Sequence, residues 1–322
     1  MRKIAYMVGI MLLMVACNGM VKRGDDNSDN STTSNDKARY EAGTRRMERT
    51  VAPIGELRSI EELNYALDHY WDGFDFECGE EVVAYNTTDI CQAVIDYTTY
   101  VIASRDLSHM ATIIERAEKS RPVLDFIWKV CEMVLHDPNS PMRNDELYIP
   151  ILERLVASPL LDEYERLIPQ HDLHIALQNR LGMVANNFKY RLADGTTGYL
   201  HDIEANYTIL MFNNPDCPMC RDIIDQIGAS PLLNELQELE RLKVIAVYPD
   251  SDLEAWHRYL DKMPRRWIVS YDEGCVIDSD DLYNISAIPA LYLLDNKKRV
   301  LIKDGTSVMQ IEEAIAYHES YK

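Results

Sequence analysis

Two cysteines, Cys217 and Cys220, are separated by two residues. Of all the residues in this sequence, their types and spacing most clearly indicate chemical reactivity. An apolar run over 207–212 predicts a buried parallel strand before them, and helical spacing over 221–227 follows them. A helix N-terminus favours a thiolate at Cys217, and Cys220 lies one turn on, close enough to form a disulfide. Pro218 costs little there, because the N–H that it lacks has no intrahelical partner in a first turn. The pattern therefore predicts a redox-active dithiol.

Two other interpretations of this pair stay open, namely half of a zinc site and a purely structural disulfide. A zinc site needs four ligands, but the sequence holds no second CxxC and no paired HxxxH. His171 and His174, three residues apart, are more typical of a solvated helix face. We therefore expect redox chemistry with no metal and no cofactor.

The composition favours an acidic, globular protein. The chain has 322 residues, and 33 lysines and arginines against 53 aspartates and glutamates give a formal net charge of −20. This length allows two domains with substantial cores. The charge argues against nucleic acid as a partner and against docking on an anionic lipid surface.

The first residues have the features of a targeting signal. A basic start over 1–3 is followed by an apolar stretch over 4–16 that is too short to span a bilayer comfortably. Its end at Cys17 resembles the lipobox of bacterial lipoproteins. The resemblance implies a signal peptide over 1–17, lipidation of Cys17 and a lipid-anchored protein in the cell envelope, with its folded domains outside the cytoplasm. The alternative is an ordinary secretory signal with an incidental cysteine.

Residues 18–52 are polar and low in complexity, so we expect a flexible tether. From 53 to 181 the pattern is helical, which predicts an all-α domain. Its first helix starts at a capping box of Ser59 and Glu62 and is broken at 72–76. Further helices are expected over 88–102, 106–119, 121–135, 144–157, 160–168 and 172–181.

The helical region resembles a domain of unknown function that often precedes a thioredoxin-like module in envelope lipoproteins. The segments 70–76 and 137–143 carry this resemblance, which implies nothing about activity. The aromatic cluster around Trp71 could be a ligand surface, but aromatic residues at a helix end more often belong to a core.

From 182 to 322 the pattern is that of an α/β domain, and we expect the two domains to fold separately. Strands are expected over 207–212, 243–248, 267–271, 291–294 and 300–303. The helix after Cys220 should stop at Gly228, a second should start at Ser230, and a capping box at Ser251 should start a third. A last helix is expected over 307–319.

This C-terminal part resembles the thioredoxin-like domain of the TlpA/ResA type, found in bacterial envelope thiol-disulfide oxidoreductases. The resemblance rests on the segment 185–188, the Cys217–Cys220 motif and the segment 287–295, in that order. It implies a three-layer α/β/α fold and a cis peptide bond at Pro289, facing the disulfide. Ile288 would be held extended to pair with a substrate backbone, and Pro218 and Met219 would contact substrate.

The sequence departs from the family pattern in the motif itself, where Asp216-Cys217-Pro218-Met219-Cys220 replaces the common Trp-Cys-Gly-Pro-Cys, and at two further positions. Relatives often bury an acid six residues before the first cysteine or place a glutamate three residues after the second, where this chain has Met211 and Ile223. Asp216 disfavours a neighbouring thiolate, while Arg221 favours one. The redox potential is therefore left open by the sequence.

The resemblance implies a mechanism in which the Cys217 thiolate attacks a substrate disulfide and Cys220 resolves the mixed disulfide. The expected partners are client proteins with disulfides and, for a reductase, a thiol donor in the membrane. Two rival functions remain. A peroxiredoxin-like peroxidase is disfavoured because Asn214 stands where that family has Thr or Ser. A non-catalytic binding lipoprotein would use the α/β fold only as a scaffold.

Four further cysteines, Cys78, Cys91, Cys131 and Cys275, remain to be assigned. Buried free thiols are common in proteins, and a Cys78–Cys91 bridge is the alternative in an exported protein. Cys275 follows a strand that ends on the active-site side of the sheet, so exchange between Cys275 and Cys217 is a further hypothesis.

Overall fold

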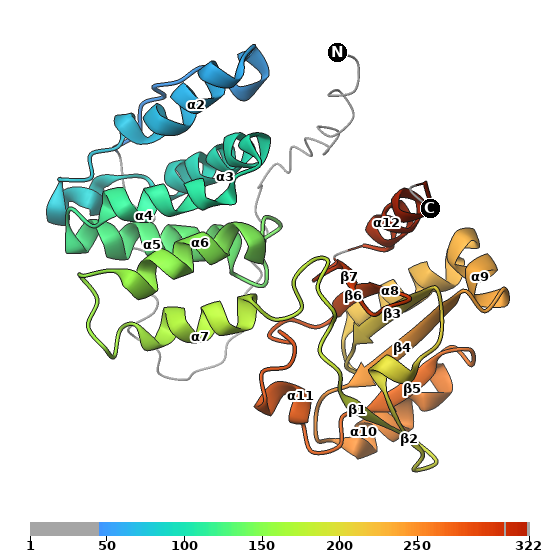
Figure 1. Ribbon diagram of the computed structural model, residues 1–322. Helices are drawn as coiled ribbons and strands as arrows, with labels where there is room; N and C mark the ends of the chain where they lie inside the picture. The colour runs from blue at the N-terminus through green and yellow to red at the C-terminus, as the bar shows by residue number, and fades with distance from the viewer. Residues whose placement is uncertain (1–44, 306, 321–322) are drawn as a thin grey trace, which may run out of the picture. The chain divides into compact units, whose positions relative to one another are not determined.

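The computed structural model describes residues 45–305 and 307–320, and all of these belong to one compact unit of the chain. The expected signal peptide, Cys17 and the tether up to residue 44 lie outside the described residues. Figure 1 follows the chain from a run of helices into a seven-stranded sheet with further helices. Within the described ranges, no helix combines the length and apolar character that a membrane span needs.

The N-terminal part is helical, as predicted. Side-chain caps start three of its helices: Ser59 Oγ accepts a hydrogen bond from the N–H of Glu62 at 3.1 Å, and the side chains of Asn86 and Asn144 do the same for α3 and α6. The helices are α2 (Ile60–His69), α3 (Thr87–Ser104), α4 (Ala111–Ala117), α5 (Arg121–Leu135), α6 (Asp145–Ala157) and α7 (Leu167–Ala176). Short 3-10 turns accompany them at Ile54–Glu56, Tyr70–Gly73, Gly79–Ala84 and Leu107–Met110.

The two helices predicted over 160–168 and 172–181 are wrong, because a single helix, α7, takes their place. The Asp162 carboxylate accepts hydrogen bonds from the N–H groups of Tyr164 and Glu165, both at 2.9 Å, and so forms a local turn before the helix. Pro169 lies in the first turn of α7, where a missing N–H costs little. The helix predicted over 106–119 is also shorter, because its first turn is 3-10.

Residues 45–52, which the sequence assigns to the tether, pack against the helical domain instead. The Arg45 N–H donates to the Ala84 carbonyl at 2.6 Å, and the Arg45 carbonyl accepts from the Asn86 N–H at 2.9 Å. A Cβ atom at Gly73 would overlap the Glu48 carbonyl oxygen, so only glycine permits this close approach. The described chain is therefore ordered several residues before position 53.

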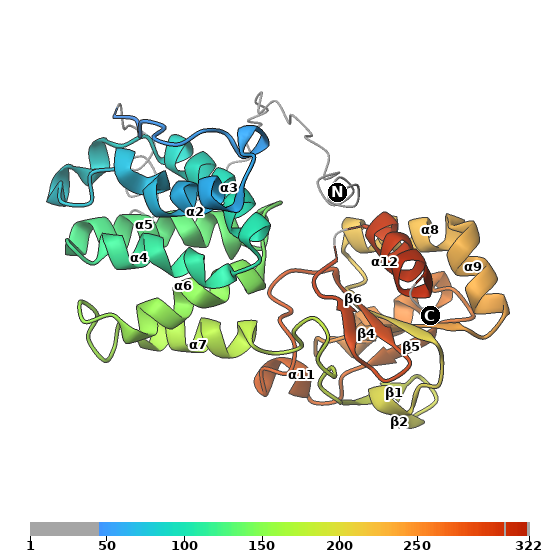
Figure 2. The same ribbon diagram turned by 45° about the horizontal axis from the view of Figure 1, so that its top comes forward.

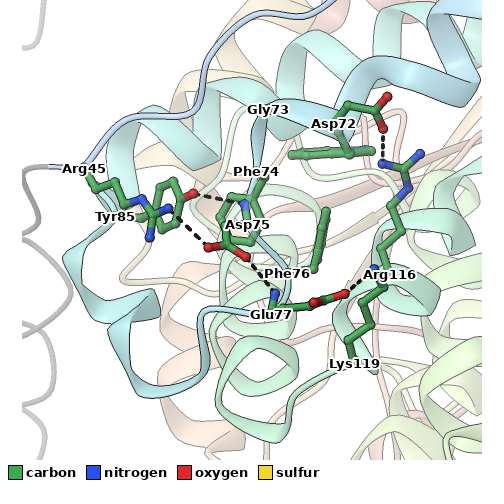
Figure 3. Close-up of a pocket in the computed structure, with 11 residues that line it drawn as sticks. Arg45, Asp72, Gly73, Phe74, Asp75, Phe76, Glu77, Tyr85, Arg116 and Lys119 are labelled. Atoms are coloured by element: carbon green, nitrogen blue, oxygen red, sulfur yellow. Dashed lines mark hydrogen bonds and ion pairs between the residues drawn. The ribbon is translucent and has the colours of Figure 1, made fainter.

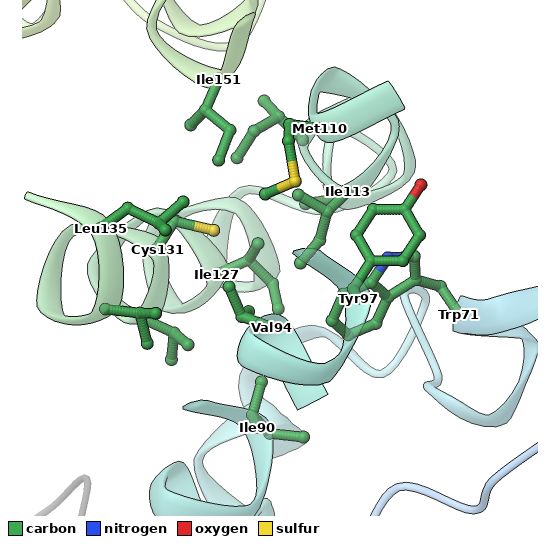
Figure 4. Close-up of a cluster of buried hydrophobic side chains, with 14 of the residues drawn as sticks. Trp71, Ile90, Val94, Tyr97, Met110, Ile113, Ile127, Cys131, Leu135 and Ile151 are labelled. Carbon is green, nitrogen blue, oxygen red and sulfur yellow. The ribbon is translucent and has the colours of Figure 1, made fainter. Parts of the chain in front are cut away.

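The core of the helical domain is apolar and continuous across α3 to α6. Figure 4 shows Trp71 beside Tyr97, with Val94, Ile127 and Cys131 in the same cluster. Trp71 is fully buried, and its ring centroid lies 5.4 Å from that of Tyr97. Burial of this kind identifies Trp71 as a core residue.

The C-terminal part is built on one mixed sheet with the strand order β2-β1-β5-β4-β3-β6-β7. Strands β3, β4 and β5 are parallel, and β6 is antiparallel to β3. The strands are β1 (Lys189–Leu192), β2 (Thr197–Tyr199), β3 (Tyr207–Phe212), β4 (Leu242–Tyr248), β5 (Ile268–Tyr271), β6 (Ala290–Asp295) and β7 (Val300–Ile302).

Both faces of the sheet are covered, which confirms the expected three-layer α/β/α domain. Along β3, Ile209 and Met211 belong to one core cluster, while Leu210 and Phe212 belong to the other. The crossovers from β3 to β4 and from β4 to β5 run in the same direction, so right-handed connections place their helices on one face. Those helices are α8 (Pro218–Ala229), α9 (Pro231–Glu238) and α10 (Leu253–Tyr259).

The last helix, α12 (Val308–Ser320), joins the same face, and Figure 2 shows it beside α8. The opposite face is covered by α11 (Val276–Ser279) and by the 3-10 turn Leu200–Asp202, while another 3-10 turn, Leu260–Lys262, follows α10. Two predicted helix ends are corrected. α8 continues through Gly228 to Ala229, and Asp252, rather than Ser251, caps α10 by accepting from the Ala255 N–H.

Buried ion pairs connect the first residue of α6 and the loop before it to the segment after β7. Lys303 Nζ lies 2.6 Å from the Asp145 carboxylate and donates to the carbonyls of Ala176 and Gln178 at 3.0 and 2.8 Å. The Lys303 and Asp145 side chains are only 8% and 5% exposed, and Arg143 lies 3.3 Å from Asp304 beside them. Charges this deeply buried are stable only with partners.

We predict that Lys303→Met lowers the free energy of unfolding of the full chain by about 3 kcal/mol, because it leaves the Asp145 carboxylate buried without a cation. Urea titration would measure this loss. The matched control is Arg258→Gln, which removes an exposed ion pair with Glu254 and should cost no more than about 0.5 kcal/mol. Equal losses in the two variants would contradict the assignment.

Candidate functional site

The pairing of β3 with β6 brings the two halves of the site together. Phe212 at the end of β3 is the register partner of Ala290 at the start of β6. Because the strands are antiparallel, the segment leaving β3 and the segment entering β6 meet at the same edge of the sheet. That edge therefore holds Cys217 and the Ile288–Pro289 peptide bond, which is cis as the sequence resemblance implies.

Cys217 is the N-cap residue of α8. Its Sγ accepts a hydrogen bond from the N–H of Cys220 at 3.0 Å, and it lies 3.6 Å from the Ile288 carbonyl oxygen. The two cysteines are joined as a disulfide with their Cα atoms 5.3 Å apart. After reduction, the same N–H group and the positive end of the helix dipole would favour a thiolate at Cys217. Pro218 follows at the first helical position, as predicted.

The two sulfur-bearing residues differ sharply in accessibility. Cys217 is half-buried, Pro218 and Met219 are exposed, and Cys220 is fully buried. Cys220 shares its apolar cluster with Met211 and Ile223, the two positions at which the family resemblance leads one to expect an acid. The outer sulfur is therefore the one that a large substrate can reach.

Two charged residues flank the pair. Asp216 and Arg221 are both exposed, and among the described residues neither forms an ion pair. The Asp216 N–H donates to Asn214 Oδ1 at 3.1 Å, which fixes the turn before Cys217. Asn214 thus supplies a carbonyl-type acceptor to its own loop rather than a hydroxyl group.

A groove of about 430 Å³ opens beside the cysteine pair. Met219 and Asp222 of α8 line it together with Ile288 and Pro289, and the helical domain supplies the facing wall through residues 138–141 and 143–146. Sequence reasoning assigned no role to this wall. The sequence offered two signals here. One was the family resemblance of 137–143, which implies no role, and the other was the run of turn-forming residues at 137–141, which marks a loop but does not tell where the loop packs.

The other four described cysteines are free thiols, so the alternative Cys78–Cys91 bridge is absent. Burial raises the pKa of the Cys91 thiol to about 11 and raises the pKa of Cys131 further. The pKa of Cys275 is also raised, by burial first and then by the neighbouring Asp272 carboxylate. Thiols with raised pKa values are mostly protonated at neutral pH, so these cysteines are weaker candidates for thiol chemistry than the Cys217–Cys220 pair.

A second cavity lies in the helical domain (Figure 3). Its volume is about 710 Å³, and Trp71 and Phe76 are among its lining residues. The basic side chains around it are all in ion pairs, Arg45 with Asp75, Arg116 with Asp72 and Lys119 with Glu77. The described residues contain no group of three or more His, Cys, Asp or Glu side chains placed to hold a metal ion.

Comparisons with known proteins agree with this division of the chain. Residues 26–179 match a domain of unknown function (DUF5106), and residues 205–300 match a thioredoxin-like family. A search of curated proteins finds no match.

Solved structures give a closer relation. A thioredoxin-like protein from Bacteroides caccae shares 33% identity with a TM-score of 0.78, over 85% of this chain and 99% of that one. The C-terminal domain of an uncharacterized protein from Bacteroides fragilis shares 40% identity over 43% of this chain and 98% of its own length, with a TM-score of 0.42. Because the first match extends over both the helical and the α/β parts, the chain belongs to the family of thioredoxin-like proteins.

Proposed function

We propose that this protein is a thiol-disulfide oxidoreductase that reduces or exchanges disulfides in client proteins through Cys217 and Cys220. One observation carries the proposal: a half-buried sulfur at a helix N-terminus stands before a fully buried one, beside the Ile288 carbonyl. The thioredoxin-like fold supports redox chemistry in general. Neither an isolated structural disulfide nor a zinc site needs this difference in exposure.

In the reductive direction, the Cys217 thiolate attacks one sulfur of the client disulfide. The client S–S bond breaks, its second sulfur leaves as a thiolate, and a mixed disulfide joins Cys217 to the client. The Cys220 thiolate then attacks Cys217 Sγ and releases the second client thiolate. Two electrons have passed to the client, and the Cys217–Cys220 disulfide that remains must be reduced by a dithiol donor before another turnover.

The residues around the pair have positioning roles in this scheme. The Ile288 carbonyl, 3.6 Å from Cys217 Sγ, is placed to meet a client backbone N–H next to the reacting sulfur. Pro289 fixes the start of the segment that enters β6, and Pro218 and the exposed Met219 present a surface to the client. The proposal thus assigns client contacts to both loops at this edge of the sheet.

We predict that, in the reduced protein at neutral pH, Cys217 is alkylated at least about tenfold faster than Cys220. The reason is that Cys217 is half-buried at the helix end while Cys220 is fully buried. Quenched iodoacetamide labelling followed by peptide mass mapping would measure both rates. Cys131, also fully buried, is the internal reference for an inaccessible thiol. Equal rates at Cys217 and Cys220 would contradict the proposed order of attack.

The catalytic assignment predicts opposite behaviour for the two single variants. Cys220→Ser should accumulate mixed disulfides with clients on Cys217, whereas Cys217→Ser should trap few or none, because the attacking sulfur is gone. Both should lose insulin-reducing activity, and Cys275→Ser should keep it. Non-reducing gels of an envelope extract and an insulin turbidity assay give the two readouts. Consumption of peroxide without insulin reduction would favour the peroxidase, and inactivity in both assays would favour the scaffold.

We further propose that Cys17 is lipidated and anchors the folded part outside the cytoplasm. The basis is the sequence alone: a basic start, a short apolar stretch and a small residue before the cysteine. Cys17→Ser should release the protein from the membrane fraction and change its N-terminal processing. Retention in the membrane fraction with unchanged processing would refute lipidation, and a second variant, Met14→Leu, should leave anchoring intact.

A further inference from the structure

The groove beside the dithiol has walls from two different parts of the chain. The α/β domain contributes Met219, whose side chain is 66% exposed, and the Ile288–Pro289 segment. The helical domain contributes the wall made of residues 138–141 and 143–146, called here the helical wall. The two cysteines do not line the groove themselves, but Ile288, which does, has its carbonyl oxygen 3.6 Å from Cys217 Sγ. A client segment that lies along the groove would therefore contact both domains.

The helical wall is a built structure. Ser140 Oγ donates to the Val134 carbonyl at 2.5 Å, and the Asn144 N–H donates to the Leu135 carbonyl at 2.9 Å, so the loop is bound to the end of α5. Within the wall, Asp145 pairs with the buried Lys303. Because Lys303 follows β7, these contacts hold the wall at a fixed distance from the sheet edge that carries the dithiol.

The charges lining the groove are nearly all neutralised. Arg143 pairs with Asp304, Lys303 with Asp145, and Glu146 with Arg180 through the bidentate contact of a guanidinium group. Asp222 is the exception among the described lining residues, because it is exposed and forms no ion pair. It lies two residues after Cys220, on the first turns of α8. Among the described lining residues, the groove thus has one unpaired negative charge, on the helix that carries Cys220.

We propose that the groove, with the helical wall as one side, selects an extended client segment that carries a basic side chain near its disulfide. Asp222 attracts the basic group, Met219 contacts the apolar part of the segment, and the helical wall limits its path. The formal net charge of −20 acts in the same direction by attracting basic clients over longer distances. This inference rests on the proposed function and gives the helical domain a part in specificity.

The test uses pre-reduced full-length protein in single-turnover reactions, so that no reductant is needed. Two synthetic peptides with one intramolecular disulfide differ only in having lysine or glutamate beside a cysteine. A third substrate, 2-hydroxyethyl disulfide, is small and uncharged and reports thiol reactivity alone. The measured quantity is the second-order rate constant of oxidation of the protein, at low and at high salt.

Asp222→Asn should lower the rate constant for the lysine peptide by about fivefold, the range expected for one exposed charge pair. The rate constant for the glutamate peptide should rise, because the substitution removes a charge that repels it, and the rate constant for the uncharged 2-hydroxyethyl disulfide should change less than either. Asp225→Asn is the matched control, because Asp225 is exposed on the same helix but does not line the groove. The effect of Asp222→Asn should shrink at high salt.

The helical wall is tested separately by Asn139→Lys. Asn139 is exposed in the wall, and a positive charge there should slow the lysine peptide by about fivefold. The control is Met133→Lys, which adds the same charge to an exposed position on α5 that does not line the groove.

The possible results separate the two proposals. The groove assignment would be overturned if Asp222→Asn and Asn139→Lys both left the rate constant for the lysine peptide unchanged. It would also be overturned if these variants changed the rate constant for 2-hydroxyethyl disulfide as much as that for the lysine peptide. The proposed oxidoreductase function would stand in both cases. A wild-type protein that fails to react with any of the three disulfides would instead overturn the proposed function itself.

Discussion

The antiparallel pairing of β3 with β6 is the constraint on which the site depends. The register places Phe212 opposite Ala290. It therefore determines the distance between the loop that follows β3 and the loop that precedes β6. A slip of one residue would turn every side chain of β6 to the opposite face and would exchange Leu291 and Leu293, which pack with Cys220, for residues of the other cluster. The two apolar clusters therefore maintain the position of Ile288 relative to Cys217.

The helical domain is connected to that same edge by charges rather than by apolar packing alone. Lys303 lies just past β7, and the Gly305 N–H donates to the Leu291 carbonyl at 2.9 Å, one residue inside β6. The ion pairs at the helical wall and the strand that carries the Ile288–Pro289 segment thus belong to one connected set of contacts.

The sequence predicted the parts of this fold that depend on local patterns. The apolar run 207–212, the cap at Ser59 and the CxxC motif need only near neighbours to be recognised, and each appears where expected. The two helices that were predicted wrongly over 160–181 have a different explanation. At 160–181 the carboxylate of Asp162 competes with the helix for backbone N–H groups, an outcome that helical periodicity does not reveal.

The helical wall could not be predicted for a further reason. Its place beside the dithiol depends on the pairing of Asp145 with Lys303, which lie far apart in the sequence and carry no shared pattern. The same holds for residues 45–52, whose polar composition is that of a tether but whose backbone pairs with Ala84 and Asn86. Both cases depend on contacts between single polar groups that lie far apart in the sequence. Hydrophobic periodicity does not reveal such contacts.

The four free thiols of the described residues require that incorrect disulfides be avoided while the chain folds. The described residues contain six cysteines, which form one disulfide and leave four free thiols. Six cysteines could instead form three disulfides in about 15 different ways. In an oxidising compartment, the helical domain buries Cys131 and half-buries Cys78 and Cys91 only once it has closed around them. Its contacts are largely local, and helical domains of that kind fold within microseconds to milliseconds, whereas disulfides form over seconds or longer. Folding speed, rather than stability, would then keep the wrong cysteines apart.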